Sequence, residues 1–107
     1  MPNHNLAFKA LADPSRRHIV EALAGRPMTV RQLTDRLPIS QSAVSQHLDV
    51  LRKAELVAFE PRGASNVYRI DPRGLGSVRG WLDRHWGEAL GNYARLFEHD
   101  GDASDGA

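Results

Sequence analysis

The chain has 107 residues, a net charge of +1 and no cysteine. A length of this order suits one domain, and the missing cysteine excludes disulfides, thiolate metal sites and cysteine nucleophiles. No apolar run approaches the roughly 18 residues of a membrane span and no signal peptide precedes the first expected helix, so we expect a cytoplasmic protein without a membrane partner.

Three short helices are predicted before residue 40. The first is indicated by four closely spaced apolar residues, Leu6, Phe8, Ala10 and Leu11. The dipeptide Asp13-Pro14 is typical of a helix start, with aspartate as N-cap and proline in the first turn, and Gly25 ends this second helix. Thr29 and Gln32 have the spacing of a capping box, which opens a third helix that Pro38 ends.

A fourth helix over residues 41–54 has two distinct faces, and Ser40 is its candidate N-cap. At 100° per residue, the apolar side centres on Val44, Leu48 and Leu51. The opposite side carries six polar residues, Ser42, Ser45, Gln46, Asp49, Arg52 and Lys53. His47 projects near the apolar side, so we expect it at the edge of the core. Two helices joined by a turn of about three residues predict a helix-turn-helix.

A β-hairpin is predicted after these helices. Residues 56–62 and Ser65–Ile70 are rich in strand-forming residues and are separated by Gly63-Ala64, which places a wing beside the fourth helix. The predicted fold class is therefore mainly α with a β-hairpin wing, a winged helix-turn-helix whose order is four helices, two strands and a last helix.

The last helix starts near Asp71-Pro72 and is expected to end near Glu98. One side of it is an apolar stripe: Leu75, Val78, Leu82, Trp86, Ala89, Tyr93, Leu96 and Phe97. A stripe of this size exceeds what a small domain needs for cover and predicts an interface. Trp81 flanks the stripe and fits either that interface or a small-molecule pocket. Residues 1–98 thus form one domain, and residues 99–107 are predicted to be a disordered acidic tail.

The polar side of the fourth helix suits DNA. Serine and glutamine reach base edges in the major groove, so four residues are candidate base readers: Gln41, Ser42, Ser45 and Gln46. Candidate phosphate contacts are Ser40 at the helix start and the cations Arg31, Arg52, Lys53 and Arg62. Residues 1–70 carry ten Lys and Arg against six Asp and Glu, although so small a surplus decides little alone. The alternative for each residue is a solvated helix face.

Catalysis has no support in the sequence. Ser45, His47 and Asp49 follow one another at a spacing of two residues, which splays them by about 200° on a helix and prevents a triad. No glycine-rich phosphate loop, metal-hydrolase motif or nucleophile elbow is present. We therefore expect no enzyme activity, no catalytic residue and no cofactor.

The sequence resembles the ArsR/SmtB family of winged-helix repressors in three segments. These are Leu11-Ala12-Asp13-Pro14-Ser15-Arg16-Arg17, then Ser42-Ala43-Val44-Ser45-Gln46-His47-Leu48 with Leu51-Arg52, and finally Val67-Tyr68. The resemblance implies a homodimer that pairs through the first and last helices, binds an inverted repeat and often represses its own operon. It places Gln41, Ser42, Ser45 and Gln46 in the groove, Arg62 in the wing contact, and Leu6 with the last-helix stripe in the dimer interface.

Neither metal site of the family is kept. The thiolate positions fall on Thr29 and Arg31, and the last-helix site falls on Asp71, Arg73, Arg84 and Gly87, so we predict no metal. Three alternatives stay open beside a repressor without effector: a protein-interaction module, gating by a small molecule, and gating by a non-thiolate metal site built from Asp83, His85, His99 and Asp102. The residues identify no effector.

Overall fold

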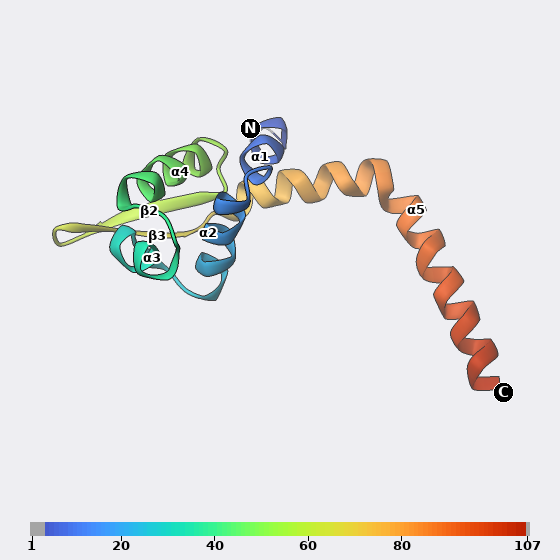
Figure 1. Cartoon of the computed structure of the whole chain (residues 1–107). Helices are drawn as coiled ribbons and strands as arrows, with labels where there is room; N and C mark the ends of the chain where they lie inside the picture. The colour runs from blue at the N-terminus through green and yellow to red at the C-terminus, as the bar shows by residue number, and fades with distance from the viewer. Residues whose placement is uncertain (1–3, 107) are drawn as a thin grey trace.

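A three-stranded sheet and four short helices form a body from which one long helix projects (Figure 1). The computed structural model describes the backbone of residues 4–106 and the side chains of residues 4–89 and 91–97. The elements in chain order are α1 (His4–Leu11), α2 (Pro14–Gly25), β1 (Met28–Thr29), α3 (Val30–Arg36), α4 (Gln41–Lys53), β2 (Val57–Arg62), β3 (Ser65–Ile70) and α5 (Pro72–Gly106). The predicted class, mainly α with a wing, is confirmed.

The sheet has the order β1-β3-β2, and both strand pairs are antiparallel. In the hairpin Arg62 pairs with Ser65, which leaves Gly63-Ala64 as a two-residue turn, and Gly63 has a φ of 59°. A positive φ is favourable for glycine at this place in a hairpin turn. The sequence does not predict β1, because two residues are too short for any strand periodicity. Its pairing with β3 joins the wing to the start of α3.

The core lies between α2, α3, α4 and the sheet. The side chains of Val44, Leu48 and Leu51 on α4 are fully buried, as predicted, and Leu33 of α3 and Ile19 of α2 are buried against them. Burying a side chain of this size contributes about 1.5–3 kcal/mol relative to leaving it in water. The orientation of α4 about its own axis is therefore set by its apolar side.

Side-chain caps start three of the helices where the sequence predicts them. The Asp13 carboxylate accepts hydrogen bonds from backbone N–H groups in the first turn of α2. Thr29 and Gln32 form a reciprocal capping box on α3, with distances of 2.9 and 3.2 Å. Ser40 Oγ accepts from the Ala43 N–H at 3.1 Å and so caps α4. Such a cap stabilises a helix by about 1 kcal/mol.

The start of α5 is fastened to the turn between α4 and β2. The N–H of Gly74 donates to the carbonyl of Glu55 at 2.8 Å, and Glu55 has a φ of 59°. Arg73 bridges the buried Asp71 at 2.7 Å and Glu55 at 3.1 Å. Hydrogen bonds from the Arg73 guanidinium lower the pKa of Asp71 and outweigh the effect of burial, which raises it. This junction sets the direction in which α5 leaves the body.

Aromatic rings hold α1 against α5. Trp81 packs on Phe8 with ring centroids 5.3 Å apart and on His85 at 4.7 Å, and His4 lies 6.5 Å from Trp81. Edge-on and tilted pairs at such distances are favourable. The sequence leaves open whether Trp81 lies in an interface or in a small-molecule pocket. In the structure, Trp81 instead forms a contact between α1 and α5 of one chain.

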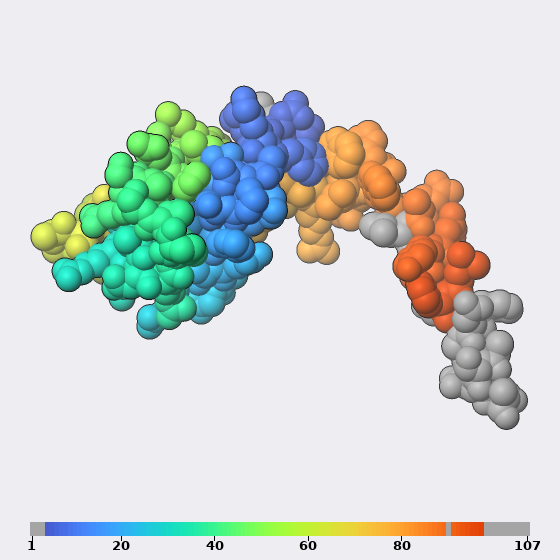
Figure 2. Space-filling view, viewed as in Figure 1, coloured from blue at the N-terminus to red at the C-terminus, as the bar shows by residue number. Residues whose placement is uncertain are grey.

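The outer part of α5 stands clear of the body and bends partway along its length (Figures 1 and 2). The helix continues through Gly106, beyond the end near Glu98 that the sequence predicts, and no proline follows Pro72 to interrupt it. The side chains of residues 98–107 lie outside the described part, so the acidic tail over 99–107 stays a prediction. In the described part of the chain, no helix combines the length and apolar character that a bilayer span requires.

We predict that Gly74→Ala lowers the free energy of unfolding by about 1–3 kcal/mol, because the added Cβ would stand against backbone that does not move easily. A Cβ at Gly74 would lie 2.5 Å from the Glu55 carbonyl oxygen and 2.8 Å from that of Ala54. The matched control is Gly76→Ala in the same helix, because a Cβ at Gly76 would have no neighbouring atom within 4 Å. It should stabilise the protein by up to ~1 kcal/mol. Urea unfolding measures both, and equal effects of the two variants would contradict the close contact.

Candidate nucleic-acid interface

The solvent side of α4 carries four polar residues, Gln41, Ser42, Ser45 and Gln46, which we call the polar face. All four side chains are exposed, and none makes a hydrogen bond to another residue in the described part of the chain. Their amide and hydroxyl groups both donate and accept, as the base edges of the major groove require. The four predicted base readers thus lie together on one exposed surface.

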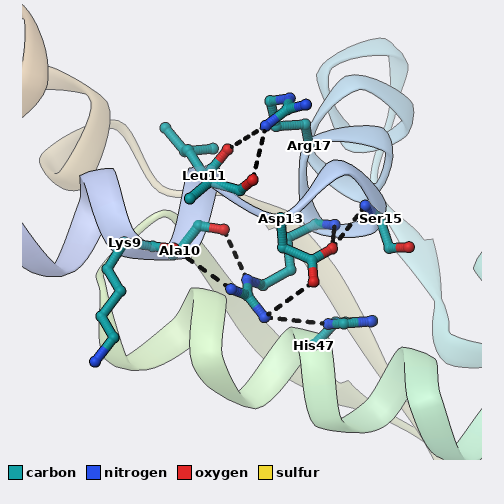
Figure 3. A network of polar contacts seen from close by, with 9 residues as sticks. Lys9, Ala10, Leu11, Asp13, Ser15, Arg17 and His47 are labelled. Atoms are coloured by element: carbon teal, nitrogen blue, oxygen red, sulfur yellow. Dashed lines mark hydrogen bonds and ion pairs between the residues drawn. The ribbon is translucent and has the colours of Figure 1, made fainter.

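A guanidinium joins α4 to the junction of α1 and α2 (Figure 3). Arg16 donates to the carbonyl of Ala10 at 2.7 Å and to that of Lys9 at 3.4 Å. The same group lies 3.8 Å from the Asp13 carboxylate and 3.4 Å from Nδ1 of His47. His47 is half-buried, at the edge of the core, as the sequence predicts.

The Asp-Pro-Ser-Arg-Arg segment therefore has a structural role. Asp13 caps α2, while Arg17 closes the end of α1 by donating to the carbonyls of Leu11 at 2.7 Å and Ala12 at 3.1 Å (Figure 3). Burial raises the pKa of the Asp13 carboxyl, but hydrogen bonds from backbone N–H groups and the charge of Arg16 outweigh it, so the pKa is lowered. These arginines orient helices rather than project from the polar face.

The two cations at the end of α4 are held by one carboxylate. Asp49 forms ion pairs with Arg52 at 3.0 Å and with Lys53 at 3.1 Å, and all three side chains are exposed. Hydrogen bonds from Lys53 and Arg52 lower the pKa of Asp49. Arg52 and Lys53 lie about 16–18 Å along the helix from Gln41, so the structure separates them from the start of the polar face.

A polar hollow of about 330 Å³ lies between the wing and the starts of α3 and α4, and we call it the wing hollow. Arg31 and Gln41, two predicted contacts from different helices, both line it. Ser65 and Asn66 of β3 line it from the wing. The sequence does not indicate these two residues, because their position depends on the register of β3 against β2.

The wing cation is paired within its own strand. The exposed guanidinium of Arg62 lies 3.1 Å from the Glu60 carboxylate. An exposed pair of this kind contributes little to stability, so Arg62 can exchange its partner for a phosphate at small cost. Arg31 has no ion pair with another described residue and is the more available cation.

The apolar stripe of α5 divides into two parts. Leu75 and Val78 pack on the core of the same chain. Leu82, Trp86, Tyr93 and Phe97 are exposed, with 52% of Trp86 and 60% of Tyr93 open to solvent, and Ala89 is exposed as well. Leu6 of α1 is 46% exposed. We call these exposed residues of α5 the outer stripe, an apolar surface that no other described side chain of the protein covers.

The residues at the family's metal positions do not fit a metal. Thr29 caps α3, and both carboxylate oxygens of Asp71 accept from Arg73. Among the side chains that the structure describes, no three of His, Asp or Glu gather as a metal site would need. Of the alternative ligand set, His99 and Asp102 lie outside the described side chains, and Asp83 instead pairs with Arg79.

The sequence matches a model of the bacterial regulatory protein, arsR family, over residues 13–58, which run from the cap of α2 into β2. It is 51% identical over 96 residues to the HTH-type transcriptional regulator Rv2034 of Mycobacterium tuberculosis, covering 90% of each chain. It is 32% identical over 78 residues to the transcriptional repressor SdpR of Bacillus subtilis, covering 73% of this chain and 87% of that one.

Solved structures agree with these relatives. A possible transcriptional regulator for arsenical resistance superposes with a TM-score of 0.69 at 40% identity, covering 75% of this chain and 83% of that one. An ArsR-like transcriptional regulator from Rhodococcus sp. RHA1 superposes with a TM-score of 0.72 at 27% identity, covering 89% of this chain and 90% of that one. Together they favour DNA binding over a protein-interaction module.

We predict that Asp49→Asn tightens binding to any DNA duplex by about two- to fivefold at low salt, because it frees Arg52 and Lys53 and removes a negative charge beside them. Fluorescence anisotropy with unrelated duplexes measures the change. The control Asp83→Asn makes the same charge change on α5, where Asp83 pairs with Arg79. If both variants tighten binding equally, the effect belongs to net charge and not to this cluster.

Proposed function

The chain belongs to the ArsR family of bacterial regulatory proteins and is a DNA-binding transcriptional regulator, and we propose that it is a repressor which binds an inverted-repeat operator as a homodimer. The observation that carries the proposal is the polar face of α4, whose four exposed side chains have no partner among the described residues. Repression follows because a dimer seated on a promoter excludes polymerase from it.

In the proposed complex, α4 enters the major groove with its N-terminal half. Gln46 and Gln41 pair with base edges, since a glutamine amide matches the donor and acceptor of adenine. Arg31, which lines the wing hollow from α3, and Arg62, the last residue of β2, contact phosphates that fix the register. The N–H groups at the start of α4 favour a phosphate as well.

The outer stripe of α5 supports the homodimer. A contiguous apolar surface on a small chain marks an interface, and exposed Trp86, Tyr93 and Phe97 supply the aromatic anchors that interfaces favour. A two-fold dimer would present two copies of α4 about 34–36 Å apart, one helical turn of DNA. The two-fold symmetry of the dimer is the reason for an inverted-repeat operator, and the spacing sets the distance between its half-sites. The promoter of the protein's own gene is the first operator to test.

We predict that one variant lowers the sequence specificity of DNA binding and that a second lowers only its affinity. Gln46→Ala should reduce discrimination between the preferred duplex and single-base variants by about 1–3 kcal/mol, because it removes a base contact. Arg62→Ala should weaken all duplexes alike and lower the slope of log K against log salt by about one, because it removes a phosphate contact. Anisotropy on a duplex selected from a random library measures both.

Arg26→Ala is the matched control for the wing variant, since Arg26 is exposed at the end of α2 and outside the proposed contacts. It should leave affinity and salt slope unchanged. If Gln46→Ala keeps the wild-type base preference, α4 does not read the groove as proposed.

We predict that Trp86→Glu converts the dimer into monomers at micromolar concentration, because the loss of a central aromatic anchor costs about 2 kcal/mol or more and the new charge would be buried. Sedimentation velocity measures the species. Arg84→Glu places the same carboxylate on the opposite side of α5, with a larger charge change because a cation is also lost, and should leave the dimer intact. A monomeric wild type, or a Trp86→Glu variant that stays dimeric, would contradict the interface.

A further inference from the structure

A second hollow lies where α1 and the first turn of α2 meet the last turns of α4, and we call it the α1–α4 hollow. Its volume is about 330 Å³, within the range of small-ligand pockets. Figure 2 shows α1 beside α4 on the upper surface of the molecule. The polar face and the wing do not contribute to this hollow, so it is separate from the proposed DNA contacts except at Lys53.

The inner surface of the α1–α4 hollow is apolar. Ala10 and Ala54 are almost fully buried and form its floor. Leu6 and Val50 form its walls, and 46% of Leu6 and 40% of Val50 face solvent. Val50 lies on a helix whose other exposed side chains are mostly polar. Apolar surface gathered in a concave site favours an apolar occupant over water.

Positive charge surrounds this apolar surface. Lys9, Arg16 and Lys53 line the hollow, and no carboxylate among the described side chains does. The Lys9 ammonium has no hydrogen bond or ion pair with another described residue. Arg16 is held in place by the Ala10 carbonyl at 2.7 Å and lies 3.8 Å from the Asp13 carboxylate, while Lys53 is paired with Asp49 at 3.1 Å. An anion in the hollow would therefore find one free cation, one fixed cation and one that can change partner.

We infer that the α1–α4 hollow binds a small monoanion with an apolar body, a carboxylate carried by an aliphatic or aromatic group. The body would cover Leu6 and Val50 while the carboxylate meets Lys9 beside Arg16. A neutral apolar molecule would desolvate these cations without compensation, and a polar polyanion would leave its own groups unpaired on the alanine floor. Both are therefore poorer occupants.

Occupancy of the hollow acts on DNA binding, a consequence that rests on the proposed function. Val50, Lys53 and Ala54 belong to α4, the same helix that carries the polar face. A carboxylate bound at Lys9 adds negative charge to the hollow that Lys53 also lines, which reduces the attraction of Lys53 for phosphate and so weakens DNA binding. The coupling is reciprocal, because DNA must then weaken ligand binding by the same factor.

The first experiment is calorimetric titration of the full-length protein without DNA, using octanoate, 1-octanol and octylammonium as probes. Octanoate should bind saturably at one site per chain, and 1-octanol about tenfold more weakly, since hydrogen bonds to charged groups are worth roughly this factor. Octylammonium should not bind. Equal affinities for octanoate and 1-octanol, or no saturable binding of octanoate, would overturn the inference.

Variants locate the site. Lys9→Gln removes the charge, shortens the side chain by one atom and keeps a polar end, and it should lower octanoate affinity to that of 1-octanol. Val50→Glu should abolish binding. Arg26→Glu, an exposed change outside the hollow, should leave it unchanged. If neither Lys9→Gln nor Val50→Glu reduces octanoate binding, the site is elsewhere. If octanoate binds only to the monomeric Trp86→Glu variant, a second copy of the chain occupies the hollow and the inference is wrong.

A second experiment separates the ligand site from its effect. Saturating octanoate should weaken binding to the selected duplex in anisotropy, and Lys9→Gln should remove this effect. Unchanged DNA affinity with octanoate bound would overturn the coupling to α4. If the protein binds no selected duplex at all, the proposed function fails, while the calorimetric result still decides whether the hollow binds carboxylates.

Discussion

The burial of one side of α4 is the constraint on which the interface depends. Val44, Leu48 and Leu51 are fully buried between α2, α3 and the sheet. The helix repeat of 3.6 residues then requires the residues between them to face solvent. Exposure of the polar face thus follows from the packing of the core. A rotation of α4 that buried the polar face would expose these three apolar side chains to water. The free energy cost would be about 1.5–3 kcal/mol for each of them.

Two joints transmit the position of α4 to the rest of the molecule. At the N-terminal joint, Arg16 connects the end of α1 and the cap of α2 to His47 of α4. At the C-terminal joint, Gly74 and Arg73 connect the start of α5 to Glu55, directly after α4. Of the two helices expected to form the dimer, α1 therefore contacts α4 itself, and α5 contacts the turn that directly follows α4. Any ligand or partner that displaces α1 or α5 must act on α4 through these contacts, and the α1–α4 hollow lies beside the first of them.

Local patterns in the sequence predicted the parts of the fold that local forces determine. The caps at Asp13, Thr29 and Ser40 and the turn at Gly63 involve residues at most a few positions apart, so spacing alone identifies them. The sequence could not predict β1, the approach of Asn66 to Gln41, or the contact of Gly74 with Glu55, because each depends on strand register or on packing between distant segments. The helix period predicts that Asp49 lies on the polar side of α4. Its ion pairs with Arg52 and Lys53 depend on side-chain rotamers, which the sequence does not give.

The central claim is that the polar face of α4 reads the major groove, one copy in each of two successive turns. Dimethyl sulfate protection on the selected duplex tests it most directly, because this reagent methylates guanine N7 in the major groove and adenine N3 in the minor groove. The account predicts two patches of protected guanine N7, centred 10–10.5 base pairs apart on one face of the DNA. Gln46→Ala should alter protection at the contacted bases in both patches. A single patch, or protection confined to adenine N3 in the minor groove, would contradict the account.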